Sequence, residues 1–184
     1  MRRISIGLPV VVLFLIAVLT LASALIWTSN RYRQVVQTEN DRRLEGFAKQ
    51  GNTLPSLSGH SIDGAPFAIL PAGTEKFLLM VFRQDCGYCN QNWPSWDRIL
   101  ANGDIRQSAV LYTTDDKITA EYNQEHPYIA TTKTLLGAAP KFTADLRLSA
   151  TPQTLLVERG KITGIWPGVL SSDEVEQIVR AMKE

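Results

Sequence analysis

Six consecutive apolar residues, Phe77–Phe82, constrain the fold of this chain more than any other feature of the sequence. Charged residues bound the run on both sides, and no polar residue alternates within it. A short continuous apolar run of this kind is typical of a strand that is buried on both faces. We therefore expect an α/β protein with a parallel sheet that helices cover.

The segments that follow this run show helical and strand periodicities in turn. Within residues 88–100, Trp93, Trp96, Ile99 and Leu100 recur at spacings of three and four, which predicts a helix with one apolar face. The other predicted elements are strands at 65–70 and 108–113, a helix at 119–136 interrupted at Pro127, a hairpin of 155–157 and 161–165, and a last helix at 174–182 capped by Ser172 and Asp173.

Composition bounds the class of protein. The chain has 184 residues, 45% of them hydrophobic and 20% charged, which is enough apolar material for a packed core. Its formal net charge is +1, and the Lys and Arg residues are scattered rather than clustered with aromatic residues. We therefore expect no nucleic-acid partner.

The N-terminal segment is predicted to enter a membrane. Residues 4–27 carry no charge over 24 positions, which as a helix is about 36 Å and exceeds a bilayer core of ~30 Å. Residues 22–24 also resemble a signal-peptidase site, so a cleaved secretory signal is the alternative. Because the apolar run continues through residues 25–27, we favour an uncleaved anchor, and both alternatives export the rest of the chain.

Three segments follow from these patterns. Residues 1–27 are the transmembrane anchor or uncleaved signal, residues 28–51 are a charged stalk or linker, and residues 52–184 are the folded domain. The last segment has the ordinary size of a domain with a single hydrophobic core.

The two cysteines of the chain, Cys86 and Cys89, stand between the predicted buried strand and the predicted helix. Cys86 then falls at the N-terminus of the helix, where free N–H groups and the helix dipole stabilise a thiolate and lower its pKa from about 8.5. Cys89 falls one helical turn further in, within reach of a mixed disulfide on Cys86. The spacing predicts that Cys86 attacks disulfides and that Cys89 resolves the intermediate by forming a Cys86–Cys89 disulfide.

Three other uses of a cysteine pair compete with this hypothesis. A structural zinc site needs two more ligands, and the spacing of His60 and His126 matches no compact ligand pattern. Covalent haem attachment is excluded because Asn90, not a histidine, follows Cys89. A purely structural disulfide remains open, although closing a loop of two residues stabilises a fold little. We therefore favour a redox-active pair and expect no metal and no cofactor.

Several short motifs precede and follow the cysteines in the sequence. They are Leu54–Pro55 with Asp63–Gly64, Pro94 inside the predicted helix, the loop Ala150–Leu155, and Gly160–Lys161 with Gly168. With the cysteine pair, they make residues 52–183 resemble the thioredoxin superfamily, and within it the membrane-tethered TlpA-like and ResA-like thiol-disulfide oxidoreductases. The resemblance implies a thioredoxin-like fold, with a central mixed sheet flanked by helices, behind one N-terminal transmembrane helix.

The resemblance also implies roles for residues beyond the cysteines. Pro152 would be a cis-proline that faces both cysteines and keeps metals away, and the backbone of Thr151 would pair with an extended substrate segment. Gly87 and Tyr88, together with the Thr before the proline, are similar to the DsbC-type periplasmic disulfide isomerases, which points to reduction or isomerisation more than to oxidation. Gly87, Tyr88 and Pro94 are thus predicted to tune the site.

Two positions depart from the family pattern, and one stretch exceeds it. Asp85 stands where the family commonly has Trp, and its charge would raise the pKa of the first thiol, with Arg83 as an offset. Met80 stands where thioredoxin has a buried acid, so the base that activates the second thiol is not identified. Residues 121–144 are longer than a minimal thioredoxin needs, and we expect an extra helix packed on the fold.

The sequence thus predicts an extracytoplasmic thiol-disulfide oxidoreductase that exchanges dithiol and disulfide with cysteines of exported proteins, in the reductive direction. It would sit in the inner membrane as a single-pass protein with its domain on the periplasmic side, and a membrane electron donor or acceptor for thiols would be its partner. Two alternatives stay open. One is a disulfide isomerase for an envelope assembly system, and the other is a non-catalytic binding module that uses Thr151, Pro152 and the surface around Trp93 and Trp96.

Overall fold

The computed structural model describes residues 17–33, 47–69, 76–137, 148 and 150–184. The chain divides into two compact units, Met1–Arg43 and Leu44–Glu184. In the first unit, residues 17–33 form a helix with exposed side chains. Among the described residues, no helix combines the length and the apolar character that a membrane span requires. Residues 4–16 of the predicted anchor and residues 34–46 of the predicted stalk lie outside the described part of the chain.

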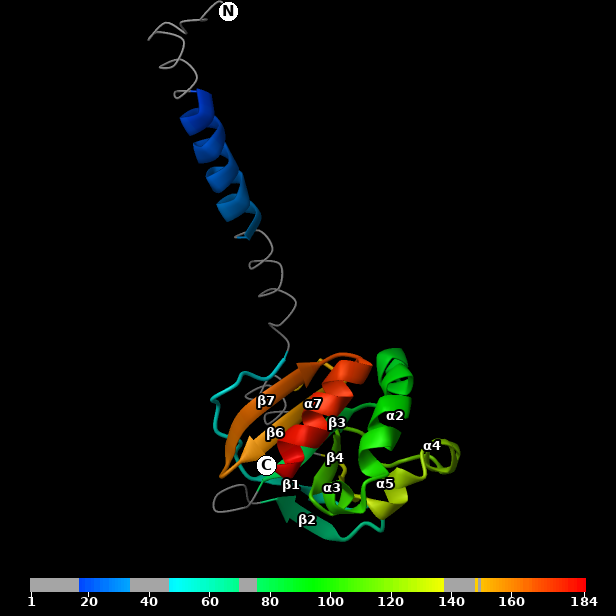
Figure 1. Ribbon diagram of the computed structural model, residues 1–184. Helices are drawn as coiled ribbons and strands as arrows, with labels where there is room; N and C mark the ends of the chain where they lie inside the picture. The colour runs from blue at the N-terminus through cyan, green and yellow to red at the C-terminus, as the bar shows by residue number, and fades with distance from the viewer. Residues whose placement is uncertain (1–16, 34–46, 70–75, 138–147, 149) are drawn as a thin grey trace, which may run out of the picture. The chain divides into compact units, whose positions relative to one another are not determined.

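The second unit is built on a five-stranded sheet with the strand order β5-β4-β3-β6-β7 (Figure 1). Its strands are β3 (Phe77–Phe82), β4 (Ala109–Thr113), β5 (Lys133–Leu135), β6 (Gln153–Glu158) and β7 (Lys161–Pro167). β4 runs parallel to β3 and β5, whereas β6 runs antiparallel to β3 and β7. A separate antiparallel hairpin pairs β1 (Leu57–His60) with β2 (Pro66–Ile69). The predicted mixed α/β architecture is confirmed.

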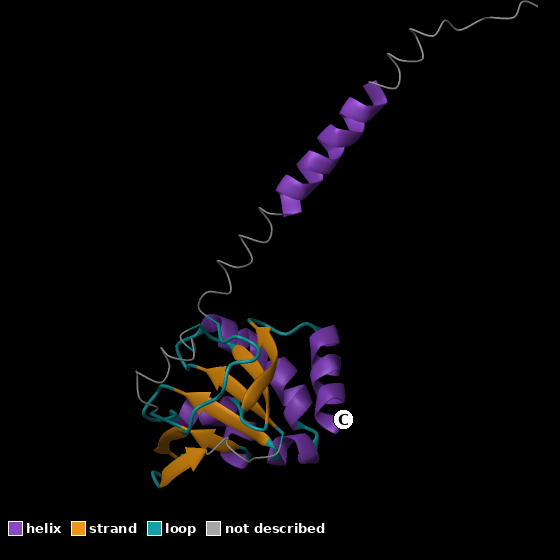
Figure 2. Cartoon of the chain, turned by 90° about the vertical axis from the view of Figure 1, so that its left-hand side faces the viewer, coloured by secondary structure: helices purple, strands orange, loops and turns teal. Residues whose placement is uncertain are grey.

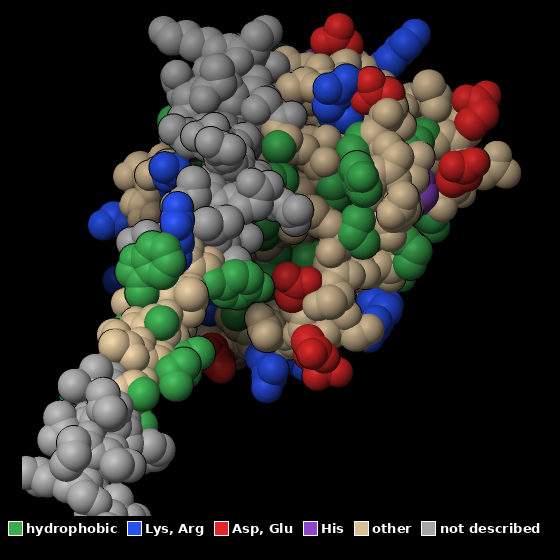
Figure 3. Space-filling model, turned by 90° about the horizontal axis from the view of Figure 1, so that it is seen from above, with side chains coloured by type: hydrophobic (Ala, Val, Ile, Leu, Met, Phe, Trp, Pro, Cys, Tyr) green, Lys and Arg blue, Asp and Glu red, His purple; other side chains and the backbone are tan. Residues whose placement is uncertain are grey.

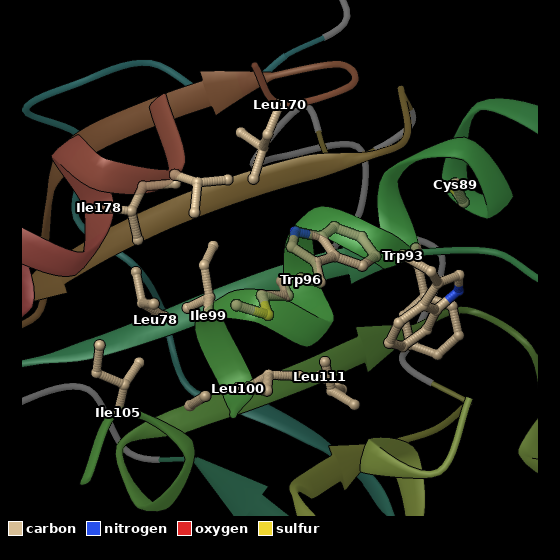
Figure 4. Packing of buried hydrophobic residues seen from close by; sticks show 14 of the residues in the cluster. Leu78, Cys89, Trp93, Trp96, Ile99, Leu100, Ile105, Leu111, Leu170 and Ile178 are labelled. Carbon is tan, nitrogen blue, oxygen red and sulfur yellow. The ribbon is translucent and has the colours of Figure 1, made fainter. Parts of the chain in front are cut away.

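The helices of this unit that the structure describes cover one face of the sheet. They are α2 (Gly87–Leu100), α3 (Gly103–Gln107), α4 (Ala120–Glu125), α5 (Tyr128–Thr131) and α7 (Ser172–Lys183). All five contribute buried side chains to one core, and α2 and α7 lie side by side over it (Figures 1 and 2). Figure 4 shows Trp96 and Ile99 of α2 beside Leu78 of β3 within this core. We call this side of the sheet the helix face.

The opposite side, which we call the N-terminal face, is covered in its described part by the start of the unit and by the β1–β2 hairpin. Ala48, Leu54 and Leu57 pack there in one core with Leu79 and Val81 of β3. Every residue of β3 is buried, because alternate side chains of the strand enter the two cores. The predicted double burial of this strand is confirmed. Among the described residues, the second layer is formed by the N-terminal segment and the β1–β2 hairpin.

The predicted helix at 119–136 is wrong in its last part. After α4 and the short α5 the chain enters β5, which pairs parallel with β4. Thr134 favours this change, since its hydroxyl donates to the carbonyl oxygens of Ile129 and Thr132 and its β-branched side chain is buried in the strand. An extra helix is expected from the sequence within residues 121–144. The described part of that stretch instead forms two short helices and an edge strand.

The last helix begins earlier than predicted. Its N-cap is Ser171 rather than Ser172 or Asp173, and the Ser171 hydroxyl accepts a hydrogen bond from the Glu174 N–H at 3.3 Å. The Glu174 carboxylate accepts one in return from the Ser171 N–H at 2.7 Å. This reciprocal capping box satisfies two N–H groups at once and fixes the start of α7.

The surface carries both signs of charge. Figure 3 shows one face of the molecule, on which acidic, basic and hydrophobic side chains are interspersed. The described residues in that view do not gather into a basic stripe of the kind that nucleic-acid binding uses.

Candidate active site

The turn between β3 and α2 presents Cys86 at the start of the helix, where the sequence predicts it. The apolar strand ends at Phe82, and the polar residues 83–85 lead the chain into α2. Cys86 is the N-cap of this helix, and its Sγ accepts a hydrogen bond from the Cys89 N–H at 3.2 Å. Cys89 lies one turn further along and is fully buried, whereas Cys86 is partly exposed. Cys86 is therefore the thiol that a protein disulfide can reach.

The two thiols differ in the groups that surround them. Burial raises the pKa of the Cys86 thiol, but hydrogen bonds from the side chains of Cys89 and Thr151 and from the N–H groups of Cys89 and Tyr88 outweigh it, so the pKa lies below its usual value. Burial first, and then the hydrogen bond with Cys86, raise the pKa of Cys89 to about 12. At neutral pH Cys86 is thus the more reactive thiol, and Cys89 keeps its proton.

The loop before β6 lies against the first cysteine. The Thr151–Pro152 peptide bond is cis, as the resemblance implies. The carbonyl oxygen of Thr151 is 3.5 Å from Sγ of Cys86, and the Pro152 carbonyl accepts a hydrogen bond from the Gly168 N–H at 2.9 Å. The two residues predicted to bind substrate therefore lie beside the predicted nucleophile.

The same loop is tied to the start of the unit through the residue that follows the proline. The Ala48 N–H donates to Oε1 of Gln153 at 3.0 Å, and Nε2 of Gln153 donates to the Ala150 carbonyl at 2.6 Å. Gln153 is fully buried, and its bond to Ala48 is buried with it. One side chain thus joins the loop to a segment that precedes it by 105 residues.

The residues predicted to tune the site lie in different environments. Gly87 and Tyr88 open α2, with the Tyr88 side chain 67% exposed, and Pro94 lies inside the same helix. Asp85 pairs with Arg83 at 2.6 Å on the surface. The Asp85 carboxylate is not among the groups that shift the pKa of the first thiol, which differs from our expectation. An exposed carboxylate that is already paired is screened by water and acts weakly on its neighbours.

A set of hydrogen bonds that the sequence does not predict holds the active-site turn from the side. Gln84, two residues before the first cysteine, donates its backbone N–H to the Asp115 carboxylate at 2.9 Å. Its side-chain amide donates to the Lys117 carbonyl at 2.7 Å and accepts from the Thr119 N–H at 2.9 Å. These partners stand 31 to 35 residues away in the chain, so no local pattern predicts the contact.

A second missed group lies on the buried side of α2. Trp93 donates its ring N–H to the Tyr122 hydroxyl at 2.7 Å, and this hydroxyl is 3.3 Å from Oδ1 of Asn90. The His126 ring stacks on Trp93 with ring centroids 4.4 Å apart. Tyr122 and His126 belong to the stretch 121–144, whose unexplained length is the sequence signal that points to this group.

Both tryptophans of α2 lie in the core. Trp93 is 1% exposed and Trp96 is 0% exposed (Figure 4). The ring N–H of Trp96 donates to the Thr154 hydroxyl at 2.8 Å. They do not form the surface that the binding-module alternative assigns to them, so that part of the alternative is wrong. Met80 is also fully buried in this core, and its thioether has no proton to transfer.

No family model matches the chain, and none of the curated proteins matches its sequence. Solved structures do match it. One is a thio-disulfide isomerase from Thermus thermophilus, with a TM-score of 0.54 and 17% identity over 73% of this chain and 96% of that one. StoA from Bacillus subtilis matches with a TM-score of 0.51 and 16% identity over 71% of this chain and 99% of that one. A secreted disulfide oxidoreductase from Mycobacterium tuberculosis matches with a TM-score of 0.54 and 19% identity over 67% of this chain and 94% of that one.

At these levels of identity the likeness shows the fold and leaves the chemistry to be argued from the site. The central mixed sheet, the cysteine at the start of α2 and the cis-proline before β6 agree with what the sequence resemblance implies. The chain therefore has a thioredoxin-like fold, the fold of the thiol-disulfide oxidoreductases that its sequence resembles.

Proposed function

We propose that this chain is a thiol-disulfide oxidoreductase that acts on protein cysteines. The observation that carries the proposal is the contrast between a partly exposed Cys86 with a lowered pKa and a buried Cys89 with a raised pKa. An accessible nucleophile and a protonated thiol one turn behind it are the two groups that dithiol-disulfide exchange needs. Two structural neighbours that are described as an isomerase and an oxidoreductase of disulfides support the proposal.

In the reductive direction the exchange has two steps. The Cys86 thiolate attacks one sulfur of a substrate disulfide, whose S–S bond breaks; the other substrate cysteine leaves as a thiolate and a mixed disulfide remains. Cys89 then gives its proton to solvent and attacks the Cys86 sulfur, and the second substrate cysteine leaves. Two electrons pass from the dithiol to the substrate, and a membrane electron donor would later reduce the Cys86–Cys89 disulfide.

The substrate would bind along the cis-proline loop. The Thr151 carbonyl lies 3.5 Å from Sγ of Cys86, so an extended segment that pairs with the backbone of Thr151 brings its own cysteine beside the nucleophile. The exposed Tyr88 ring, two residues after Cys86, offers an apolar contact at the same place.

The reductive direction is favoured because the Cys86 thiolate is stabilised only in part. A couple becomes strongly oxidising when its reduced thiolate is strongly stabilised. Here burial, the largest single influence on the pKa of Cys86, opposes the thiolate, so the hydrogen bonds that stabilise it lower this pKa only against that opposition. Isomerisation is the second candidate, supported by the likeness to the Thermus thermophilus isomerase.

The location that we propose for this activity is the outer face of the inner membrane, with residues 1–27 as the anchor and cysteines of exported proteins as substrates. The uncharged run from Ile4 to Trp27 supports the anchor. Carbonate-washed membrane fractions should retain the full-length chain. A mature form in the soluble fraction that begins at Leu25 would refute the anchor and leave the redox chemistry untouched.

Reduction of insulin tests the activity itself. Cys86→Ser should abolish reduction, whereas Cys89→Ser should stop after the first step and accumulate a mixed disulfide. The double variant is the matched control and should form no adduct. The proposal is overturned if the wild type leaves insulin unreduced and Cys89→Ser traps no adduct. Recovery of a scrambled substrate without net reduction would replace the reductase by the isomerase.

A further inference from the structure

Two residues that closely follow the resolving cysteine in α2 contact the same tyrosine. Asn90 follows Cys89 in α2, and Trp93 stands one turn beyond it. The ring N–H of Trp93 donates to the Tyr122 hydroxyl at 2.7 Å, and that hydroxyl donates to Oδ1 of Asn90 at 3.3 Å. One hydroxyl from α4 therefore bonds to two residues in the turn of the active-site helix that follows Cys89.

Tyr122 is itself held in place by its surroundings. Its backbone N–H donates to the Thr119 hydroxyl at 3.2 Å, and the Thr119 N–H donates to Oε1 of Gln84 in the active-site turn at 2.9 Å. Its ring stacks with Phe82, the last residue of β3, at a centroid distance of 6.1 Å, and the residue is only 8% exposed. Packing and capping thus fix the position of the hydroxyl.

The protonation state of the hydroxyl follows from its surroundings. Burial is the largest cause that raises the pKa of Tyr122 to about 12, and the hydrogen bond from the Trp93 ring N–H acts in the opposite direction. The hydroxyl therefore stays protonated at neutral pH. A protonated hydroxyl can donate to Asn90 while it accepts from Trp93.

Resolution of a mixed disulfide depends on the placement of Cys89. The N–H of Cys89 already lies 3.2 Å from Sγ of Cys86, so a fixed backbone leaves only the side chain to move. The rate of such an intramolecular attack falls steeply when the reacting atoms are displaced. On the basis of the proposed function, we infer that Tyr122 is a positioning residue that holds the first two turns of α2 so that Cys89 can attack the mixed disulfide on Cys86.

The two steps can be separated with dithiobis-nitrobenzoate as the oxidant of the reduced full chain. The Cys86 thiolate attacks its disulfide, one thionitrobenzoate leaves, and a mixed disulfide forms. Cys89 then loses its proton to solvent and attacks the Cys86 sulfur, and the second thionitrobenzoate leaves. Two electrons pass from the protein dithiol to the reagent. Stopped-flow absorbance measures a rate for each release.

Tyr122→Phe keeps the ring and removes the hydroxyl. We expect the second release to slow about tenfold, because both bonds to the turn that follows Cys89 are lost, and the first release to change by less than about twofold. Tyr128→Phe is the matched control, since the same atom is removed from a ring in α5 that lies 5.5 Å from the Arg106 guanidinium, and it should leave both rates unchanged. Asn90→Ala removes one of the two contacts at an exposed position and should slow the second release by a smaller factor.

A merely structural role for Tyr122 would slow both releases equally or neither of them, and either result overturns the inference. If Tyr122→Phe does not fold, Asn90→Ala decides, and an unchanged second release in that variant also overturns it. Insulin reduction by the wild type is measured separately. If the wild type does not reduce insulin but Tyr122→Phe slows only the second release, the proposed function is refuted and the role of Tyr122 stands. If the wild type reduces insulin normally but Tyr122→Phe does not slow the second release selectively, the role of Tyr122 is refuted and the proposed function stands.

Discussion

The two faces of the central sheet carry different kinds of side chain. The helix face holds Cys89, both tryptophans of α2, Tyr122 and the buried amide of Asn92. The N-terminal face is mainly aliphatic, with Leu79 and Leu155 among its members. Because successive residues of a strand point to opposite faces, the same strands serve both cores. We infer from this difference that the proposed redox chemistry depends chiefly on the helix face, while the N-terminal face chiefly contributes stability.

The largest effect should come from the N-terminal face. Leu79 is fully buried there, and Leu79→Ala should lower the free energy of unfolding by about 3 kcal/mol, since apolar contacts are lost and a cavity remains. Both rates of thionitrobenzoate release should stay at their wild-type values. Urea denaturation and stopped-flow absorbance measure the two properties.

Met80→Ala is the matched variant on the helix face, because Met80 is equally buried and follows Leu79 in β3. Met80→Ala should lower the free energy of unfolding by a similar amount, and it should also change the rate of the second thionitrobenzoate release. Altered release rates in a folded Leu79→Ala protein, or unaltered rates in Met80→Ala, would break the division between the faces.

A smaller effect is expected from one hydrogen bond within the helix face. The Trp96 ring N–H donates to the Thr154 hydroxyl at 2.8 Å, and both residues are fully buried. Thr154→Val removes the acceptor and should cost about 1 to 2 kcal/mol of unfolding free energy. A double-mutant cycle with Trp96→Phe isolates the pair and should return a coupling of about 1 kcal/mol. A coupling near zero would show that ring packing alone holds Trp96.

Acid pH should weaken the helix face by a smaller amount. The His126 ring stacks on Trp93, and burial lowers the pKa of His126 in the folded protein, with Glu125 acting in the opposite direction. The unfolded chain therefore binds the proton more readily. The stability that neutral His126 contributes is present above the unfolded pKa of about 6.5 and is lost as the pH falls from there through the folded pKa.

His126→Phe keeps a ring on Trp93 and removes the titrating group. Its free energy of unfolding should fall less than that of the wild type between about pH 7 and pH 5, as urea denaturation at each pH would measure. An equal fall in both proteins would assign the acid sensitivity to other groups.

The smallest effect is expected at Asp85, outside both cores. Since its exposed carboxylate pairs with Arg83 at 2.6 Å, Asp85→Asn should lower the pKa of Cys86 only slightly and move the redox couple slightly in the oxidising direction. Arg83→Gln should act in the reverse sense. The pH dependence of alkylation and equilibration with glutathione buffers measure both shifts. A large shift would mean that the surface ion pair, and not the helix face, controls the thiol.

Sequence alone predicts the parts of the site that are contiguous in the chain. The apolar run of β3 and the helical spacing after it place Cys86 at the helix start and Cys89 one turn inside. Thr151 and Pro152 carry no periodic signal, and only the family resemblance brings them to the cysteines.

Contacts between distant segments could not be predicted in this way. Gln84 and Asp115 are 31 residues apart, and the hydroxyl of Tyr122 reaches Trp93 across 29 residues. Periodicity shows which face of a segment is apolar, but it does not show which loop that face meets. β5 was missed for a related reason, because a strand of three residues is too short to show an alternation.

The bond between Ala48 and Gln153 has a practical consequence for anyone who shortens the chain. A soluble form cut at the predicted boundary of residue 52 discards the N–H that Ala48 donates to Gln153, whereas a form that begins before residue 47 keeps it. Gln153 directly follows the cis-proline, so the cut alters the support of the loop that is proposed to bind substrate. The choice of the first residue in an expression vector thus affects the support of a loop 105 residues downstream.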